Sequence, residues 1–199
     1  MIIYSNSVCA KSHCVRLVLA EKGVHCDLKI IDSQNPPQNL QQLNPYNESF
    51  TFVDHEVVLY EAQIIIEYLD ERFPHPPLMP VDPVNRANNR LCRYRIQRDL
   101  YTNLETLQGG CGKRKAATAR RKMRENLTAL APIFTQKTYF MSDEYSLMDC
   151  YLVPLLWRLP IFSIELPRPA KPVLSYAQRL FNRETFQTSL TLIEREMRT

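Results

Sequence analysis

The residues most capable of chemistry lie near the beginning of the chain, in the run Cys9-Ala10-Lys11-Ser12. This run comes just before the apolar positions of an expected helix. A helix N-terminus and a neighbouring lysine are both surroundings that favour the thiolate form of a cysteine. Cys9 is therefore a candidate nucleophile for thiol chemistry, although an incidental thiol at the start of a helix would give the same pattern.

The other cysteines and the histidines form no recognisable site in the sequence. Six cysteines are scattered along the chain without a CxxC pair, so the pattern indicates neither a disulfide framework nor a zinc site. The four histidines are equally dispersed, and there is no glycine-rich phosphate loop. We therefore expect no metal ion and no other cofactor.

The composition is that of an ordinary globular protein. The chain has 199 residues, 45% of them hydrophobic, which is enough for one large domain or two small ones. Its net charge of +4 is too small to require a nucleic-acid partner. No apolar run approaches the roughly 18 residues that span a bilayer, and the unpaired cysteines suit a reducing compartment. We expect a cytoplasmic protein that does not associate with membranes.

The first part of the chain alternates between strand and helix patterns. Strands are expected at residues 2–4, 26–30, 50–53 and 57–60, and helices at residues 15–22, 38–43 and 62–73. Gly23 ends the first of these helices and Pro74 the last. The order β-α-β-α-β-β-α predicts a sheet with helices on its faces.

From Pro83 onward the apolar residues recur at helical spacing only. Two long amphipathic helices are expected over residues 92–107 and 116–134, and a last one over residues 173–180. Between them, a helix begins at Ser146, whose hydroxyl can cap the free N–H groups, while Asp149 faces the positive end of the helix dipole. These two residues predict a structural capping box.

Several of these segments resemble the glutathione-transferase superfamily, namely residues 15–23, the pair Tyr60-Glu61 that opens a helix, and Ser146 with Asp149. Residues 67–80 (EYLDERFPHPPLMP) and 149–160 (DCYLVPLLWRLP) are more specific. They resemble the stringent starvation protein A family, whose members are RNA-polymerase-associated members of that superfamily. The resemblance covers nearly the whole chain.

The resemblance implies a glutathione-transferase fold, with an α/β thioredoxin-like N-terminal domain (residues 1–76), a proline-rich linker (77–84) and an all-α C-terminal domain (85–199). It implies a homodimer. It also implies a stress-response regulator of transcription that contacts the RNA polymerase holoenzyme, including the primary sigma factor, and that is not an enzyme.

Glutathione transferases hold glutathione partly by a backbone turn at a cis-proline, in a setting such as Val-Pro-Thr-Leu. The matching residues here are Ser49-Phe50-Thr51-Phe52. A cis bond before a non-proline residue costs about 2.5–4 kcal/mol, against roughly 0.5–1 kcal/mol before proline. We therefore expect a trans peptide at Phe50 and displaced docking groups.

A second device of that superfamily is an acidic residue followed by serine at the start of the third helix, where the γ-glutamyl carboxylate binds. This chain has Glu61-Ala62 instead, and the missing hydroxyl removes a hydrogen bond worth about 1.5–3 kcal/mol. Phe50, Glu61 and Ala62 therefore mark a degraded glutathione site. The leading hypothesis is a binding protein without transferase activity. Its rival is a glutathione-dependent thiol transferase that uses Cys9.

A preorganised docking element is expected where prolines fix the backbone before any partner arrives. The residues assigned to partner binding are Pro74, His75, Pro76, Pro77, Leu78 and Met79. His75 would supply a polar contact, and the last two residues would add apolar contacts. A plain interdomain linker would give the same proline pattern, but the resemblance implies that this loop lines the surface that meets the polymerase complex.

A basic cluster forms a second candidate surface, in one helical region of the chain. It consists of Lys113, Arg114, Lys115, Arg120, Arg121, Lys122 and Arg124. A solvated helix face commonly has this composition. The alternative is contact with an acidic protein surface or, indirectly, with promoter DNA phosphates, which added salt would weaken steeply.

Overall fold

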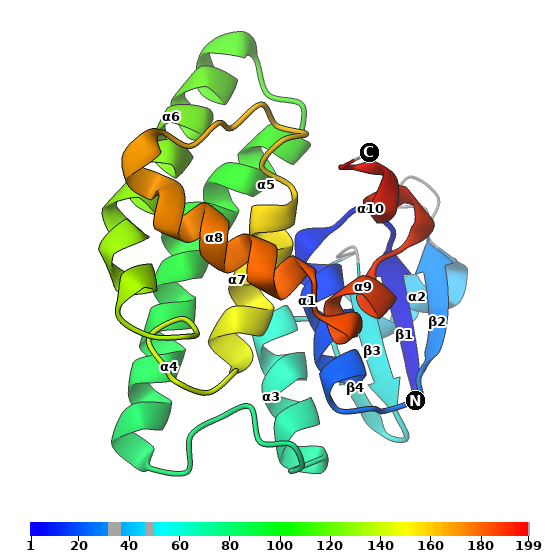
Figure 1. Ribbon diagram of the computed structural model, residues 1–199. Helices are drawn as coiled ribbons and strands as arrows, with labels where there is room; N and C mark the ends of the chain where they lie inside the picture. Colours follow the sequence, from blue (N-terminus) through cyan, green and yellow to red (C-terminus); the bar gives the residue numbers. More distant parts are fainter. Residues whose placement is uncertain (32–36, 47–49, 199) are drawn as a thin grey trace. The chain divides into compact units, whose positions relative to one another are not determined.

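The computed structural model describes residues 1–31, 37–46 and 50–198 (Figure 1). The chain forms two compact units, of which one comprises Met1–Pro77 with Glu184–Thr199 and the other Leu78–Arg183. The final segment therefore packs with the N-terminal unit, whereas the boundaries drawn from the sequence place it in the helical domain. The two-part organisation, α/β followed by all-α, is the one that the sequence predicts.

A four-stranded mixed sheet with the order β2-β1-β3-β4 forms the centre of the first unit. Its strands are β1 (Ile2–Asn6), β2 (Asp27–Ile31), β3 (Phe50–Asp54) and β4 (Val57–Leu59). β1 runs parallel to β2 and antiparallel to β3, so that Ile3 lies opposite both Leu28 and Phe52. The central position of β1 explains why its polar Ser5 is buried along with its apolar residues.

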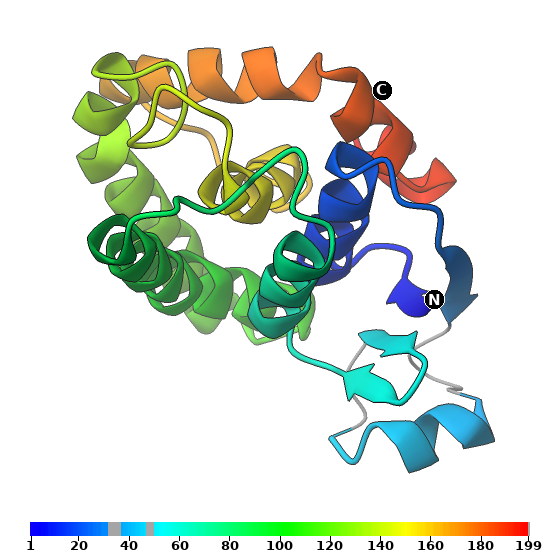
Figure 2. The same ribbon diagram turned by 90° about the horizontal axis from the view of Figure 1, so that it is seen from below.

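Helices cover both faces of this sheet. α1 (Ala10–Glu21) packs against α3 (Ala62–Arg72), and Figure 2 shows α2 (Gln38–Leu43) on the opposite side of the strands. Successive side chains of a strand point to opposite faces, and Tyr4 accordingly shares a core cluster with Leu40 of α2. The described strands and helices follow the predicted order β-α-β-α-β-β-α.

Two short helices at the end of the chain complete the first unit. They are α9 (Glu184–Ser189) and α10 (Leu192–Glu196). α9 packs against α1, where the Phe186 ring lies 5.0 Å from the His13 ring. As a result α1 is buried over most of its length, including its polar first turns.

The second unit is helical throughout its regular structure. Its elements are α4 (Pro83–Ile96), a π-helical turn η1 (Gln97–Tyr101), α5 (Thr102–Gln108), α6 (Lys113–Leu130), the 3-10 turns η2 (Ala131–Thr135) and η3 (Arg168–Ala170), α7 (Leu147–Trp157) and α8 (Lys171–Phe181). Every residue of α7 is buried, so this helix forms the core of the unit. Within the described ranges, none of the helices combines the length and the apolar character that crossing a bilayer requires.

The capping box expected at the start of α7 is confirmed. The Ser146 side chain accepts from the Met148 N–H, and an Asp149 oxygen accepts from the Ser146 N–H at 2.9 Å. The other Asp149 oxygen accepts from the Phe140 N–H and from the Tyr176 hydroxyl. The pKa of Asp149 is nevertheless raised above its ordinary value, because burial of the carboxyl outweighs these hydrogen bonds.

Candidate functional site

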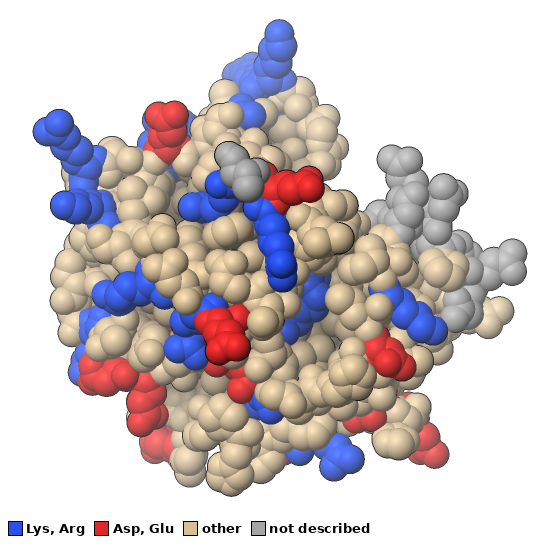
Figure 3. Space-filling view, turned by 45° about the vertical axis from the view of Figure 1, so that its right-hand side comes forward, with Lys and Arg blue, Asp and Glu red and all other residues tan. Residues whose placement is uncertain are grey.

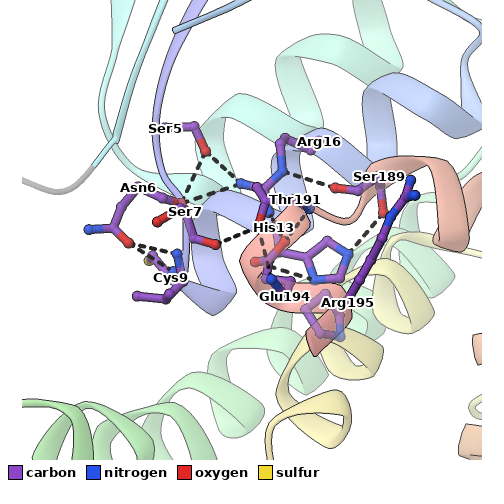
Figure 4. Close-up of polar contacts among 12 residues, drawn as sticks. Ser5, Asn6, Ser7, Cys9, His13, Arg16, Ser189, Thr191, Glu194 and Arg195 are labelled. Carbon is purple, nitrogen blue, oxygen red and sulfur yellow. Dashed lines mark hydrogen bonds and ion pairs between the residues drawn. The ribbon is translucent and has the colours of Figure 1, made fainter. Parts of the chain in front are cut away.

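Cys9 occupies the N-cap of α1, with extended backbone angles of φ −72° and ψ 126°. Its N–H and that of Val8 donate to Asn6 Oδ1, at 3.2 and 2.8 Å (Figure 4). This turn joins β1 to α1 and leaves the Cys9 side chain partly exposed, whereas Ser12 is fully buried. The Cys-x-x-Ser run therefore presents its cysteine, but not its serine, to solvent.

A buried polar cluster lies beside this turn and connects α1 to the end of the chain (Figure 4). Arg16 Nη2 lies 2.5 Å from Glu194 Oε2, and Arg16 Nε donates to the Ser189 carbonyl oxygen at 3.0 Å. Arg16 Nη1 donates to Ser5 Oγ on β1. Arg16 therefore ties together the sheet, α1 and the C-terminal segment.

His13 forms a second link between α1 and α9. Ser189 Oγ donates to the Phe186 carbonyl oxygen at 2.7 Å, and His13 Nε2 lies 2.9 Å from the same hydroxyl. Because the single hydroxyl proton is already used, His13 Nε2 must be the donor. The other ring nitrogen, Nδ1, lies 3.9 Å from Glu194 Oε1.

The C-terminal segment also holds the residues just before Cys9. Thr191 Oγ1 donates to the Ser7 carbonyl oxygen at 2.8 Å. Thr191 and Glu194 form a capping box at the start of α10, so the residue that pairs with Arg16 also fixes this helix end. No pattern in the sequence predicted this cluster as a whole; the Thr191-x-x-Glu194 spacing is the one local signal that could have revealed it.

The residues of the degraded glutathione site lie at the start of β3 and α3. Phe50 is buried in β3 opposite Ser5. Ser49 lies outside the described residues, so the expected trans peptide at Phe50 stays a prediction. Glu61 is the N-cap of α3 and its carboxylate accepts from the Gln63 N–H at 3.3 Å, while Ala62 is fully buried. The N-terminus of α3 is thus capped by the chain's own carboxylate.

The proline loop, residues 74–77, is exposed throughout. Its peptide bond His75–Pro76 is cis. Lys22 Nζ donates to the Pro76 carbonyl oxygen at 2.5 Å and pairs with Asp70 Oδ1 at the same distance. Lys22 is the C-cap residue of α1, Asp70 lies in α3, and both are buried. The loop is therefore held by a buried ion pair that joins the end of α1 to α3.

Leu78 and Met79 are not part of this exposed surface. They are only 3% and 6% exposed, because their apolar side chains pack inward where the second unit begins. The Leu78 carbonyl oxygen accepts from the Leu147 N–H at 2.9 Å, which fixes this part of the chain to the start of α7. The expectation that these two residues add apolar contacts for a partner is therefore wrong for this conformation.

The basic cluster lies on the first part of α6, and all of its members except Arg120 are exposed. Arg120 Nε donates to the Phe162 carbonyl oxygen at 2.6 Å, which holds a loop of the second unit. Arg121 lies 3.3 Å from Glu125 in an exposed ion pair. In Figure 3 Lys and Arg side chains project from the upper part of the view, the level at which Figure 1 places the start of α6.

Comparison with known proteins places this geometry in a family. The glutathione S-transferase N-terminal domain family matches residues 3–77, and the corresponding C-terminal domain family matches residues 94–184. A stringent starvation protein A homolog of Coxiella burnetii is 46% identical over the whole chain and 95% of its own length. The homolog of Pasteurella multocida is 45% identical over 96% of the chain and 90% of its own length. The chain belongs to the stringent starvation protein A family.

Enzymes also resemble this member of the stringent starvation protein A family. A probable maleylacetoacetate isomerase of Caenorhabditis elegans is 31% identical over 83% of the chain and 81% of its own length. The solved structure of BphK, a bacterial glutathione transferase, superposes with a TM-score of 0.88 at 20% identity, with both chains fully covered. A likeness at that identity shows the glutathione-transferase fold alone.

The described residues contain no cluster of side chains that could bind a metal ion. Among those residues, no three His, Cys, Asp or Glu side chains come together around one point.

Proposed function

We propose that this member of the stringent starvation protein A family regulates transcription by binding the RNA polymerase holoenzyme, including its primary sigma factor. The proline loop is the proposed contact. The observation that carries the proposal is the anchoring of an exposed prolyl segment by the buried ion pair of Lys22 and Asp70.

Anchoring matters because a loop that is already ordered loses little conformational freedom on binding. The prolines fix their own φ angles, and Lys22 holds the Pro76 carbonyl oxygen. His75 lies between prolines with its side chain exposed and offers a partner both hydrogen bonds and a ring face. Such a surface suits protein–protein contact better than chemistry on a small substrate.

The exposed basic residues of α6 supply a second contact in this proposal. They would face an acidic surface of the polymerase complex or, indirectly, promoter DNA. Binding through such residues weakens as salt is added. A steep salt dependence that disappears when Lys113, Arg114 and Lys115 are replaced by glutamine would support this part of the proposal, and an unchanged dependence would contradict it.

The proposal includes the loss of glutathione transferase activity. Glu61 occupies the N-terminus of α3 with its own carboxylate, and Ala62 leaves no hydroxyl for a γ-glutamyl group. Ser12 is buried and cannot share a substrate with Cys9. The dimer implied by the family stays part of the proposal as well.

A thiol transferase is the second candidate, because Cys9 is partly exposed at the N-terminus of a helix of 12 residues. A glutathione-affinity column followed by a reductase-coupled assay separates the two functions. Retention with turnover that disappears in Cys9→Ser favours the enzyme. Flow-through of the protein, with polymerase binding unchanged in Cys9→Ser, favours the regulator.

The central experiment replaces Pro74, His75 and Pro76 by alanine and measures binding to purified bacterial RNA polymerase holoenzyme. We expect affinity to fall at least about tenfold, or roughly 1.4 kcal/mol of binding free energy. The matched control replaces Pro160 and Pro167, which are exposed prolines of the second unit. Equal affinity of the loop variant and the control, with both folded by circular dichroism, would refute the assignment of the loop.

A further inference from the structure

One side of α6 carries a row of exposed basic side chains. An α-helix has 3.6 residues per turn, so residues that are 7, 8 or 11 positions apart lie on the same side of it. By this spacing Lys115 and Lys122 lie together on a neighbouring side, about 100° away. The row itself, called the basic stripe below, consists of Lys113, Arg114, Arg121 and Arg124.

The charge of the basic stripe is almost entirely uncompensated. Arg121 lies 3.3 Å from Glu125, the one acidic residue in the sequence of α6. The other three side chains of the stripe have no ion-pair partner in the part of the chain that the structure describes. A solvated helix face ordinarily mixes both signs, because opposite charges three or four positions apart stabilise a helix and like charges destabilise it. Arg121 and Arg124 are instead like charges three positions apart.

The beginning of the stripe occupies the least favourable place in α6 for a cation. The N-terminal end of a helix carries a partial positive charge, so acidic residues stabilise it and basic residues oppose it. Lys113 and Arg114 are the first two residues of α6, its first turn has no acidic residue, and Gly112 at the N-cap offers no side-chain acceptor. The stripe is therefore arranged against the stability of its own helix, and such local conflicts are expected at functional sites.

The neighbouring chain extends the positive surface. η3 and α8 both pack against α6 (Figure 1), and Arg168 of η3 and Lys171 of α8 are exposed. Arg120 Nε donates to the Phe162 carbonyl oxygen at 2.6 Å, which fixes the loop before η3 to the helix. This loop also carries the exposed Glu165. The two added cations outnumber this carboxylate, so the surface beside the stripe is net positive.

The stripe offers charge and almost no apolar surface. Among the described residues, none of the large apolar side chains that are exposed belongs to α6. Protein–protein interfaces are centred on buried aromatic and apolar anchors, with charged residues depleted at the core. A nucleic-acid backbone is instead bound chiefly by lysine and arginine contacts to phosphate. The composition of the stripe therefore favours a nucleic acid over an acidic protein surface.

The residues between the basic side chains favour a duplex that is recognised by its charge. Ala117 and Thr118 separate Arg114 from Arg121 and are small enough to let the helix approach a phosphate backbone closely. Thr118 Oγ1 donates to the Arg114 carbonyl oxygen at 3.0 Å, so its proton is not available for a base. α6 contains no aromatic residue on which unpaired bases could stack.

We propose that the basic stripe binds the phosphate backbone of double-stranded DNA directly and without sequence preference. A duplex carries one negative charge per about 1.7 Å of its axis, so the roughly 16 Å of helix between residues 113 and 124 faces about nine phosphates. The inference rests on the proposed function for its setting, since a regulator bound to RNA polymerase holoenzyme lies close to promoter DNA. It narrows the contact to one side of α6 and names its partner.

The test is fluorescence anisotropy of a labelled DNA duplex of about 20 base pairs, titrated with the full chain between about 0.05 and 0.2 M salt. We expect the logarithm of the binding constant to fall with the logarithm of the salt concentration with a slope of about −4, because each neutralised phosphate contributes about −0.9. Two duplexes of unrelated sequence should bind equally.

Arg114→Gln with Arg124→Gln should weaken DNA binding about tenfold or more at the lowest salt and make the slope shallower by about 2. The matched control is Lys115→Gln with Lys122→Gln, which removes two exposed charges from the neighbouring side of the same helix. It should weaken binding less than about threefold, because only screened long-range attraction is lost. Urea unfolding should show the stripe variant to be at least as stable as the wild type, since it removes a cation from the first turn.

Glu125→Gln gives a change in the opposite direction. It removes the carboxylate beside Arg121 and should strengthen DNA binding. Three results would overturn the proposal: no salt-dependent binding of the duplex, equal weakening by the stripe variant and its control, or tighter binding of a duplex RNA of the same sequence. A fourth is a wild type that binds no duplex although the stripe variant loses affinity for polymerase holoenzyme without DNA, since the stripe then meets an acidic protein surface.

The alanine variant of the proline loop separates this inference from the proposed function. With Pro74, His75 and Pro76 replaced, the protein should lose affinity for polymerase holoenzyme and keep its affinity for the duplex. A wild type that binds the duplex through the stripe but does not bind the holoenzyme would refute the proposed function alone. A wild type that binds the holoenzyme through the loop but does not bind the duplex would refute the DNA contact alone.

Discussion

Arg16 and Glu194 form a buried ion pair, with 2.5 Å between Nη2 and Oε2, although 178 positions separate them in the chain. The pair joins the first helix of the α/β unit to the last helix of the chain. Glu194 also accepts from the Thr191 N–H at 2.9 Å, so one carboxylate both caps α10 and neutralises Arg16. The segment after residue 183 is therefore an integral part of the first unit.

Replacing Glu194 by alanine should destabilise the protein by about 3–5 kcal/mol, because it leaves the buried Arg16 guanidinium without its counter-charge. The free energy of unfolding in urea, measured by circular dichroism, gives this number directly. A loss below about 1 kcal/mol would mean that water or another group compensates Arg16.

Glu125→Ala is the matched control for this change. It breaks the ion pair of Arg121 and Glu125, whose side chains are more than half exposed, and exposed pairs contribute only about 0–1 kcal/mol. The double variant Arg16→Met with Glu194→Leu should recover most of the lost stability, since an apolar pair of similar volume can replace a buried ion pair.

Lys22→Met should destabilise the first unit and also loosen the proline loop. Asp70 would be left buried without its cation, at a cost of about 3–5 kcal/mol, and the Pro76 carbonyl oxygen would lose its donor. Adding Asp70→Leu removes the buried carboxylate and should restore much of the unfolding free energy. It does not restore the bond to Pro76.

The double variant therefore separates two effects of Lys22→Met, the loss of stability and the loss of the hydrogen bond that holds the proline loop. If the anchored loop is the polymerase contact, Lys22→Met with Asp70→Leu should be as stable as the wild type within about 1 kcal/mol and still bind RNA polymerase holoenzyme more weakly. Wild-type affinity in this stable variant would show that the anchor is dispensable for binding.

Those parts of the fold that depend on local patterns could be predicted from the sequence. Alternation gave the strand and helix order of the first unit, and the spacing of Ser146 and Asp149 gave the cap of α7, because the N–H groups of a helix end need nearby acceptors. Apolar periodicity predicts that α1 begins at residue 15, whereas the helix begins at Ala10. Its first turn is polar, so apolar periodicity gives no signal there.

The candidate site could not be predicted in the same way, because it is formed by contacts between residues that are far apart in the chain. Arg16 and Glu194 look like ordinary surface charges in the sequence, and only packing of α9 and α10 on α1 buries them. The π-helical turn at Gln97–Tyr101 interrupts a run that reads as one helix, since apolar spacing barely changes across a single extra residue. Leu78 and Met79 follow an exposed loop, and no local feature shows that they turn inward.

Asp149→Asn should change the pH dependence of stability. Burial raises the pKa of Asp149 in the folded protein, so the folded state binds this proton more tightly than the unfolded state. The resulting contribution to stability is complete below the unfolded value of about 3.9 and is lost as the pH rises through the folded-state pKa. The destabilisation caused by Asp149→Asn should therefore be larger at acidic than at neutral pH.

Urea unfolding between pH 4 and 7.5 tests the Asp149 prediction, with Ser146→Ala as the comparison. Ser146→Ala removes the cap, which costs about 0.5–2 kcal/mol, but keeps the carboxyl. Because hydrogen bonds from Ser146 lower the pKa of Asp149, this variant should keep the wild-type direction of pH dependence. A destabilisation by Asp149→Asn that grows toward neutral pH would contradict the raised pKa.

Cys26 and Cys92 should be slow to alkylate in the folded protein. Burial raises the pKa of each thiol from an ordinary value of 9.0 to about 11. The thiolate is the reacting species, so two pKa units lower its fraction at neutral pH about a hundredfold. Iodoacetamide labelling followed by mass spectrometry should show this difference between native and urea-unfolded protein, site by site.

The pH dependence distinguishes this electrostatic effect from simple steric protection. A raised pKa makes the labelling rate of Cys92 in the native protein keep rising about tenfold per pH unit beyond pH 9, whereas shielding alone would let it level off near 9. Arg95 lowers the pKa of Cys92, so Arg95→Gln should slow the labelling of Cys92 further and leave that of Cys26 unchanged. Levelling near pH 9 in the native protein would show that the Cys92 thiol is merely shielded.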